Sequence, residues 1–570
     1  MSRRHNRNLF FIASTGELRG EVNRPATPSE CERAFRFSEI VSGTTPAPSD
    51  ELLEAIADVM TQDGDDIDSH IPAGFTYLAQ FVDHDLTRDR TDVPFGTPVT
   101  DPSQLKQARS PALDLDSVYG IGPTVEPGFY QPDGIRLNTG KTQESSPPNA
   151  DRPLDDFDLP RKGATAAEPE EVRMAQIPDP RNDENLAVGQ THLAFIRFHN
   201  RVCDRLANSS VPSIMLFERA REAVVKHYQW MLKTDFLPRI VDPAIVDDVF
   251  HNGRKIFEVK ETGFPTMPIE FSVAAYRLGH SMIREKYDWN AVFSDGGAVG
   301  QIGDFGTLIN LFRFSGTSGN LSPSASDGSG PSDVNNPLDG NFERLPTNWI
   351  ADWTRLYNFV EDGTPELAPE TTLNFARPLD TRLTNPLKNL PLGSFNARGG
   401  GGTVPPIQLN LAFRNLARAR MVGLASGQEV AAYIANKIPG THVLSKDEIL
   451  GDDLNALSET LKTELTTSTP LWFYILREAS LNLDSGKLGT GKLGAVGGRI
   501  VAEVFHRAIE GSQISIIRDP SFTPSLGAKP GVFRMTDLLR VAYDASKGEL
   551  RPLSPDAPRP PALKVLPSQA

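Results

Sequence analysis

The sequence has very little cysteine, with only Cys31 and Cys203 among 570 residues. Two cysteines exclude a small disulfide-stapled scaffold, because such domains need several bridges to replace a hydrophobic core. Cys203 falls within an apolar helical pattern, where a buried free thiol is the expected state. The cysteine content is therefore compatible with a reducing compartment and does not prove one.

Long apolar runs are also missing, since no stretch approaches the roughly 20 apolar residues that span a bilayer. The basic N-terminus is followed by Leu9-Phe-Phe-Ile-Ala13, which is too short for the apolar region of a signal peptide. We therefore expect no transmembrane segment. The localisation stays open between the cytoplasm and export by a non-classical route.

Positive charge is in deficit, because 58 Lys and Arg residues face 73 Asp and Glu residues, giving a formal net charge of −15. A chain of this charge repels phosphate backbones, so no nucleic-acid partner is expected. The apolar content of 39% is sufficient for a large core. We expect one catalytic domain over residues 51–550, after an N-terminal arm at 1–50 and before a Pro-rich extended tail at 551–570.

Strand-like alternation is scarce, and helical spacing of apolar residues dominates. We predict a mainly α fold, a large single domain with long irregular loops and very little β. Segments rich in Pro, Gly or Ser at 121–170 and 314–342 are predicted as surface loops that shape access to a site. Helices are predicted at 51–60, 73–88, 184–207, 214–235, 270–285, 408–422, 427–436, 446–464, 469–478 and 494–510.

The segment Phe75 to Thr87 places His84 between two carboxylates near the end of an apolar helical pattern. Helical spacing predicts that Gln80, Asp83 and His84 project together from one helix end. A neutral imidazole can take up and return a proton near pH 7. The motif alone is equally compatible with a solvated helix terminus carrying a locally satisfied histidine.

Three further segments carry chemistry-bearing residues at regular spacing. Asp179-Pro-Arg181-Asn-Asp-Glu184 begins a helical pattern, with Arg181 and Glu184 on one face. In Arg277-Leu-Gly279-His280 the glycine permits close approach of a bulky group to the backbone. Arg414-Asn-Leu-Ala-Arg418-Ala-Arg420 supplies an amide and three arginines.

In this order the motifs resemble those of the animal-type haem peroxidases, the peroxidase-cyclooxygenase superfamily, in its bacterial branch. The resemblance spans about residues 70 to 510. The family's distal Gln, Asp-His-Asp, Asp-x-Arg-x-x-Glu, proximal Arg-x-Gly-His and asparagine motifs fall on Gln80, Asp83, His84, Asp85, Asp179, Arg181, Glu184, Arg277, Gly279, His280 and Asn415.

The resemblance implies haem b as the cofactor. His84 is then the distal acid and base, Arg181 the fixed cation beside it, and Gln80 a residue of the distal cavity. On the other haem face His280 is the iron ligand, and Asn415 orients it through its second ring nitrogen. Arg277 belongs to the same cofactor-binding set, and Arg418 falls on a propionate-binding arginine.

Two carboxylates correspond to those that form ester bonds to haem methyl groups in mammalian members, and they fall on Asp83 and Glu184. Covalent attachment is therefore a hypothesis for this chain. The most oxidising member of the family has a methionine directly after the glutamate, whereas this sequence has Asn185. The sulfonium bond of that member, and the strong chloride activity that accompanies it, are not expected here.

The family's calcium loop falls on Ser110 to Gly120. Asp85, Asp114 and Asp116 would supply three carboxylates to a hard cation, with Ser110 and the carbonyl of Ala112 as further oxygen ligands. Without the following Val-Tyr-Gly, Asp114-Leu-Asp116 would more often be a solvated turn. Because Asp85 is adjacent to His84, loss of calcium is expected to loosen the distal base.

The resemblance implies a peroxidase that reduces hydrogen peroxide through a ferryl intermediate and oxidises small phenols or amines, or halide and thiocyanate ions. A fatty-acid dioxygenase on the same scaffold is the first alternative. Its radical tyrosine lies three residues before the proximal histidine, where this chain has Arg277. Tyr276 is one residue away, which on a regular helix turns the side chain by about 100°. A non-catalytic scaffold or adhesion protein that holds haem or calcium is the second alternative.

A glycine-rich stretch from Gly486 to Gly494 contains fragments of two nucleotide-binding patterns. Leu493 lacks the hydroxyl that a phosphate loop needs, and a helix rather than a strand precedes the stretch. We predict a loop that enters a helix instead. His192 and His199 lie on one face of the helix after Glu184 and are predicted to be packed, hydrogen-bonded histidines.

Overall fold

The computed structural model describes residues 10–12, 18–20, 37–62, 67–91, 93–99, 101, 104–144, 154–167, 171–209, 211–260, 265–295, 306–317, 342–369, 372–390, 405–481 and 491–554. Helices dominate these residues, as predicted. The expected arm and tail fall largely outside them, as do Cys31 and most of 314–342. The strands form short pairs: β1 (Phe10–Ile12) with β2 (Leu18–Gly20), β3 (Phe37–Ser38) with β6 (Met267–Pro268), β4 (Gly140–Lys141) with β5 (Asp155–Asp158), and β7 (Lys286–Tyr287) with β8 (Gly306–Thr307).

Seventeen α-helices occur in the described residues. They are α2 (Asp50–Met60), α3 (Gly74–Leu86), α4 (Asp116–Tyr119), α5 (Leu186–Asn208), α6 (Ser213–Met231), α7 (Leu237–Ile240), α8 (Pro243–Asn252), α9 (Gly279–Met282), α10 (Leu308–Arg313), α11 (Leu411–Met421), α12 (Gly427–Lys437), α13 (Lys446–Leu450), α14 (Glu459–Thr467), α15 (Leu471–Leu481), α16 (Gly497–Gly511), α17 (Met535–Ala542) and α18 (Lys547–Leu550).

Two of the predicted helices were wrong as continuous elements. The 446–464 pattern is split into α13 and α14, because Gly451 ends α13 at φ 52° and Ser458 caps a new helix. The 270–285 pattern is a π-helical turn η7 (Glu270–Ala274), a 3₁₀ turn η8 (Ala275–Leu278) and then the short α9. Helix α8 was not predicted, although Asp242 followed by Pro243 is a helix start signal.

Helix α3 lies at the centre of the molecule and is buried along most of its length. Its Phe81 ring stacks on Phe195 of α5 at a centroid distance of 4.4 Å. At its start, a Cβ on Gly74 would lie 2.3 Å from the Tyr357 ring, and the Tyr357 hydroxyl donates to the Gly74 carbonyl at 2.8 Å. Glycine is required there because the ring occupies the space of a side chain.

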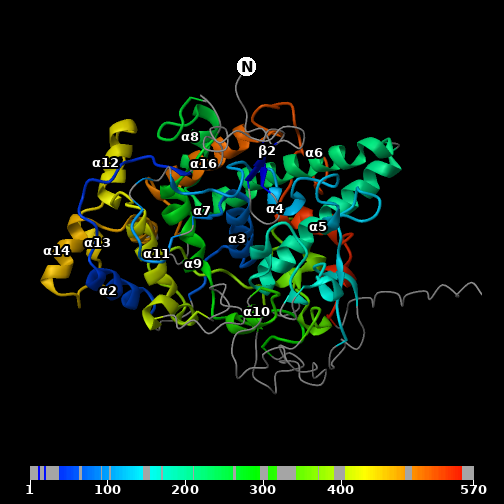
Figure 1. The fold of residues 1–570 in the computed structure, drawn as a ribbon, viewed down its shortest axis with the longest axis horizontal. Coiled ribbons are helices and arrows are strands. Elements are labelled where there is room, and N and C mark those ends of the chain that lie inside the picture. Colours follow the sequence, from blue (N-terminus) through cyan, green and yellow to red (C-terminus); the bar gives the residue numbers. More distant parts are fainter. Residues whose placement is uncertain are drawn as a thin grey trace, which may run out of the picture.

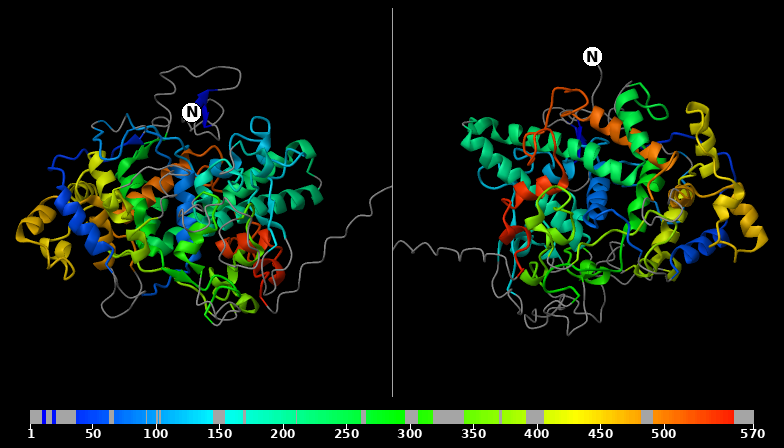
Figure 2. Two further views of the ribbon diagram at one scale, coloured as in Figure 1. Left: turned by 60° about the horizontal axis from the view of Figure 1, so that its bottom comes forward. Right: turned by 180° about the vertical axis from the view of Figure 1, so that it is seen from behind.

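Helices α2, α12, α13 and α14 gather at one end of the longest dimension, and α5 and α6 lie toward the other, with α3 between them (Figures 1 and 2). The buried apolar residues form one cluster that runs from Phe37 to Leu553. The helix that carries the predicted distal motif is therefore held from several sides by a continuous core, which limits its movement.

The start of the segment predicted as a 314–342 surface loop is buried. Phe314 and Ser315 are both 0% exposed, and the Phe314 ring stacks on Phe342 and Trp349.

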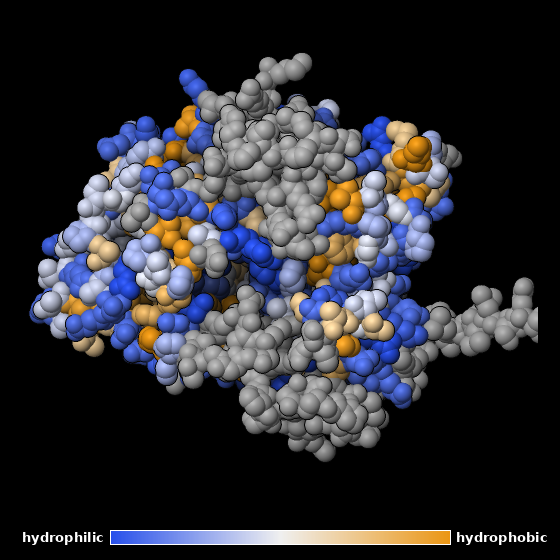
Figure 3. Space-filling view, in the orientation of Figure 1, coloured by the Kyte–Doolittle hydropathy of each residue, from blue (hydrophilic) through white to orange (hydrophobic). Residues whose placement is uncertain are grey.

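Hydrophobic and hydrophilic areas alternate among the residues coloured in Figure 3. Within the described ranges, no helix combines the length and apolar character that crossing a membrane requires.

Candidate active site

A cavity of about 370 Å³ brings together residues from all four predicted motifs. Its polar lining comes from α3, the segment before α5, the η8–α9 turn and α11. These residues are Gln80, Asp83, His84, Glu184, Asn185, Tyr276, Arg277, His280, Arg414, Asn415 and Arg418. Apolar side chains such as Phe95, Leu308, Phe312 and Leu411 complete the wall. Residues more than 300 positions apart thus share one site.

His84 is 4% exposed, and each of its ring nitrogens has a distinct neighbour. Its Nδ1 lies 2.8 Å from Oδ1 of Asn182, and its Nε2 lies 3.6 Å from Oε1 of Glu184. Burial, followed by the charge of Arg181, lowers the pKa of His84 to about 4. The ring is therefore neutral near pH 7 and can accept a proton.

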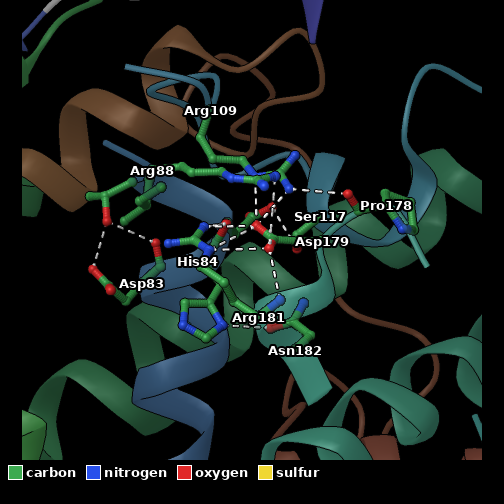
Figure 4. Close-up of polar contacts among 12 residues, drawn as sticks. Asp83, His84, Arg88, Arg109, Ser117, Pro178, Asp179, Arg181 and Asn182 are labelled. Atoms are coloured by element: carbon green, nitrogen blue, oxygen red, sulfur yellow. Dashed lines mark hydrogen bonds and ion pairs between the residues drawn. The ribbon is translucent and has the colours of Figure 1, made fainter. Parts of the chain in front are cut away.

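Arg181 lies beside His84, but its guanidinium is turned toward Asp179 and is not part of the cavity wall (Figure 4). Asp179 is 0% exposed and accepts from Arg181 Nη2 at 2.7 Å and Nε at 3.1 Å. Arg181 Nη2 also donates to the backbone carbonyl of His84 at 3.2 Å. In this arrangement Arg181 braces the helix end that carries His84.

Asp179 also binds Arg109, a residue that the sequence analysis did not select (Figure 4). Arg109 Nε donates to Asp179 at 2.9 Å, and Arg109 Nη1 lies 3.8 Å from Asp116 Oδ1. Burial alone would raise the pKa of Asp179, but Arg109 and Arg181 hold it well below its usual range. The charged chain from Asp116 through Arg109 and Asp179 to Arg181 links the predicted calcium loop to the distal site.

Gln80 is held between Glu184 and Asn185. Its Nε2 donates to Glu184 Oε1 at 2.5 Å, and its Oε1 accepts from Asn185 Nδ2 at 2.8 Å. Burial raises the pKa of Glu184 against the effects of Arg181 and Gln80. Because 35% of the Glu184 side chain is exposed, its pKa rises fully only when the cavity holds no bulk water.

His280 also lines the cavity and pairs with Asn415, whose Nδ2 lies 2.7 Å from His280 Nδ1. Burial, followed by the charge of Arg277, lowers the pKa of His280 to about 3 and keeps the ring neutral. Rotation of the Asn415 amide by 180° would present its oxygen, so that Nδ1–H donates and Nε2 is left as a metal ligand. Neutral imidazole is the form that metals bind.

The remaining predicted cofactor contacts lie around this cavity. Arg277 Nη1 is 3.6 Å from Asp83 Oδ2, and Thr87 donates to Asp83 Oδ1 at 2.9 Å. Arg418 lines the cavity and is paired with Asp89. Both arginines line the cavity and could bind the carboxylate of a ligand there.

Tyr276 lines the cavity, although it lies one residue from the position of the radical tyrosine in the predicted alternative. The backbone around it is not a regular α-helix, since the π-helical turn η7 is followed by the 3₁₀ turn η8, which holds both Tyr276 and Arg277. The Tyr276 ring stacks on Phe271 at 4.7 Å, and its buried hydroxyl has no hydrogen-bond partner in the described residues. Rotation by about 100° per residue holds only within a regular helix.

The predicted calcium ligands converge on one point. Ligand oxygens of Asp85, Asp114 and Asp116 lie within 4.8 Å of one another, and all three residues are buried. Leu115, at φ 59°, turns the loop so that its own N–H reaches Asp85 Oδ2 at 3.2 Å. Burial, then Asp116 and Asp114, raise the pKa of Asp85 well above its usual range, the condition that a divalent cation would relieve.

Of the other two predicted calcium ligands, Ser110 is in the cluster. Its hydroxyl donates to Asp114 Oδ1 at 3.1 Å, and its N–H donates to Asp116 Oδ2 at 3.2 Å. Ala112 lies in the same loop and is 0% exposed. The cluster also has Tyr228, which donates to Asp85 Oδ2 at 3.3 Å and which the loop pattern gave no reason to select.

The histidines predicted to be structural are packed. His199 is 0% exposed, lies 3.1 Å from the Tyr119 hydroxyl, and has Nε2 2.9 Å from the carbonyl of Ile135. His192 lies 2.9 Å from Asn182 Nδ2 through Nδ1. Neither lines the cavity. The end of the glycine-rich stretch, Leu493, bridges to Val241 just before α16, as expected of a loop that enters a helix, and 482–490 lie outside the described residues.

The comparison with known families matches residues 80–297 to the animal haem peroxidase model. This part of the chain, less than half of its length, is similar to that family. A peroxidase-like protein from Margaritifera margaritifera is 29% identical over 192 residues, which are 33% of this chain and 23% of that protein. The matched region thus covers about a quarter of that curated relative. The bacterial branch of the family stays a prediction from the motifs.

Among solved structures, peroxidase A from Dictyostelium discoideum aligns over 89% of this chain and 92% of its own, with a TM-score of 0.52 and 14% identity. This likeness concerns the fold alone. A fatty acid alpha-dioxygenase from Oryza sativa covers 94% of this chain and 86% of its own, with a TM-score of 0.49 and 13% identity.

Proposed function

We propose that residues 51–550 form a haem peroxidase domain that reduces hydrogen peroxide and oxidises small organic donors such as phenols and amines. The observation that carries the proposal is the pair of neutral histidines, the buried His84 and the partly exposed His280, on the walls of one cavity. One can serve as a proton carrier and the other as a metal ligand. Bound haem would supply the redox-active iron at which peroxide is reduced.

The residues present fit haem. A flat apolar group matches the wall made by Phe95, Leu308, Phe312 and Leu411, and its carboxylates match Arg277 and Arg418 at the edge. His280 would hold the iron through Nε2, with Asn415 accepting from Nδ1–H. Every residue named for this fit to haem lines the cavity.

His84 would move the proton. Its Nε2 would take a proton from one oxygen of hydrogen peroxide and return it to the oxygen that leaves as water. Arg181 braces the His84 backbone and keeps a fixed positive charge close to this nitrogen, which favours developing negative charge on the substrate. Gln80 also lines the cavity, with both ends of its amide held by hydrogen bonds.

The choice of donor follows from the same wall. Gln80 is tied by both ends of its amide to Glu184 and Asn185, which leaves it less able to reorient toward an anion. Together with the formal charge of −15, this favours neutral phenols and amines over halide or thiocyanate ions. Asn185 also excludes a sulfonium bond at this position.

Calcium is proposed at Asp85, Asp114 and Asp116, with Ser110 and the Ala112 carbonyl completing the ligands. Three buried carboxylates so close together repel one another, and Arg109, 3.8 Å from Asp116, offsets part of this repulsion. Ester bonds to haem through Asp83 and Glu184 are a further part of the proposal, since both carboxylates line the cavity.

The test is an absorption spectrum of the full-length protein purified with haemin and calcium. We expect a Soret band that changes when peroxide is added and that is lost in His280→Ala. His251→Ala changes an exposed histidine and is the matched control, which should retain the band. Folded protein that never takes up haem would refute the proposal, and an unchanged peroxide rate in Arg181→Ala would favour the non-catalytic scaffold.

A fatty-acid dioxygenase is the second candidate, and Tyr276 favours it. The buried hydroxyl lines the cavity and has no hydrogen-bond partner in the described residues. Oxygen uptake with linoleate in the absence of peroxide, lost in Tyr276→Phe, would support this candidate. Peroxide-dependent phenol oxidation that survives Tyr276→Phe, with no oxygen uptake, supports the peroxidase.

A further inference from the structure

Three buried side chains form a linear hydrogen-bonded chain behind the cavity. Asn182 is 0% exposed and lies between His84 and His192. Its Oδ1 is 2.8 Å from His84 Nδ1, and its Nδ2 is 2.9 Å from His192 Nδ1. The outer end, His192 Nε2, is buried and has no hydrogen-bond partner in the described residues.

The direction of these bonds follows from the chemistry of an amide. The oxygen of Asn182 only accepts, so His84 must carry its proton on Nδ1. The NH₂ group of Asn182 only donates, so His192 must be unprotonated at Nδ1 and carry its proton on Nε2. A neutral imidazole has one donor and one acceptor nitrogen, which makes the two tautomers interdependent.

The surroundings of His192 favour this direction. Its ring lies against the Phe81 ring at a centroid distance of 5.9 Å and an interplanar angle of 72°, in an edge-on arrangement. Its burial lowers its pKa to about 3, so the ring is neutral and one nitrogen is always free to accept. In this direction the unpartnered nitrogen of His192 is an N–H group in aromatic surroundings, where a weak contact is available to it, whereas the reversed amide would leave a bare nitrogen there.

We propose that Asn182 and His192 are positioning residues that fix the tautomer of His84, leaving Nε2 as its basic nitrogen. If the amide were reversed, His84 would be protonated on Nε2 and could not take a proton from a substrate in the cavity. Nδ1 points away from the cavity wall toward Asn182, so its lone pair could not replace that function. The role in turnover rests on the proposed peroxidase function, whereas the tautomer itself does not.

The direct test is ring-nitrogen NMR of isotope-labelled histidine in the full-length protein, with bound haem kept diamagnetic by reduction under carbon monoxide. Signals of His84 and His192 are identified by their loss in His84→Gln and His192→Gln. We expect the proton of His84 on Nδ1 and that of His192 on Nε2. A proton on Nε2 of His84 would overturn the proposal.

Three variants separate tautomer control from general destabilisation. Asn182→Leu removes both hydrogen bonds at similar volume and should give a mixture of His84 tautomers, whereas Asn182→Asp still accepts from Nδ1–H and should keep the native one. His199→Phe changes another buried histidine of α5 outside the chain and is the matched control, with the His84 tautomer unchanged. An unaltered tautomer in Asn182→Leu would overturn the proposal. If that variant does not fold, His192→Phe tests the same dependence from the other end.

The functional consequence is measured as the rate constant for reaction with peroxide. Asn182→Leu should lower it on the order of tenfold, the factor given by one lost hydrogen bond, and Asn182→Asp should restore most of the loss. Equal losses in both variants would refute tautomer control. If the wild-type protein fails to react with peroxide while its tautomers are as expected, the peroxidase proposal fails and the tautomer assignment stands.

Discussion

The buried Asp179 and the partly exposed Arg181 form an ion pair beside His84, with Nη2–Oδ2 at 2.7 Å and Nε–Oδ1 at 3.1 Å. Arg181 does not line the cavity, and its guanidinium donates instead to the backbone carbonyl of His84. The same carboxylate binds Arg109, which reaches the acidic loop. One buried charge thus couples two parts of the proposed site.

Replacement of Asp179 should be costly in stability. Asp179→Asn leaves the buried Arg109 without its main counter-charge, and loss of one partner of a buried pair typically costs about 3 to 5 kcal/mol. Chemical denaturation followed by circular dichroism measures this change in unfolding free energy. Asp519→Asn alters a solvent-exposed carboxylate that pairs with Lys226 and should change the unfolding free energy much less. Equal changes in unfolding free energy for the two variants would show that the ion-pair network of Asp179 does not stabilise the fold.

Removal of calcium should destabilise the protein and weaken peroxide reduction together. A chelator leaves three buried carboxylates within 4.8 Å of one another, and Leu115 N–H and Asp85 connect them to α3. A cation present at 100 times its Kd stabilises a fold by about 2.7 kcal/mol, so the melting temperature should fall on chelation. Asp114→Asn should lose most of this response. A wild-type melting temperature that changes with neither chelator nor added calcium would contradict the calcium site.

Covalent haem attachment should depend on the two carboxylates in the cavity. After turnover with peroxide, acid and organic-solvent extraction should leave haem on the wild-type protein. Glu184→Gln and Asp83→Asn should each remove one ester, and the double variant should release all haem. Mass spectrometry of the extracted protein counts the bonds. Complete release from the wild-type protein would limit both residues to non-covalent contacts.

Acid sensitivity should come in part from His227. Its Nε2 accepts from the N–H groups of Ser525 and Leu526, at 3.1 and 3.3 Å, and burial lowers its pKa from 6.5 to about 4. Between pH 6.5 and 4 the unfolded chain therefore binds more protons than the folded one, so stability falls as the pH decreases through this window. Full protonation corresponds to roughly 3 kcal/mol, because one pKa unit is about 1.4 kcal/mol.

The measurement for His227 is the unfolding free energy at pH 7 and pH 4.5 for the wild type and His227→Phe. The variant should lose less stability than the wild type on acidification, by about 2 kcal/mol. His251→Phe changes an exposed histidine and should follow the wild type. The same loss in all three proteins would place the acid sensitivity elsewhere.

Much of the site could be found from sequence because its residues fall in short local motifs. Gln80, Asp83 and His84 share one turn of α3, and the spacing of the acidic loop encodes the approach of Asp114 and Asp116. Helical periodicity likewise predicted α3, α5 and α16. Where a residue's neighbours are within a few positions, regular backbone geometry fixes their relation.

Other features depended on contacts across the whole chain. Arg109 and Asn182 carry no motif of their own, and their roles appear only when Asp179 and His192 are packed beside them. The orientation of Arg181 toward Asp179, and of Tyr276 toward the cavity, depends on local backbone turns that periodicity does not encode.

The mainly helical fold and the short motifs follow from residue type and local spacing, so both could be predicted before the structure was known. Only the tertiary structure decided which charged groups face one another and which atoms of each side chain are turned to the cavity. Those choices depend on desolvation and on hydrogen-bond partners, many of which lie far apart in the chain. The tautomer of His84 belongs to this second group, since it is set by Asn182, 98 positions away.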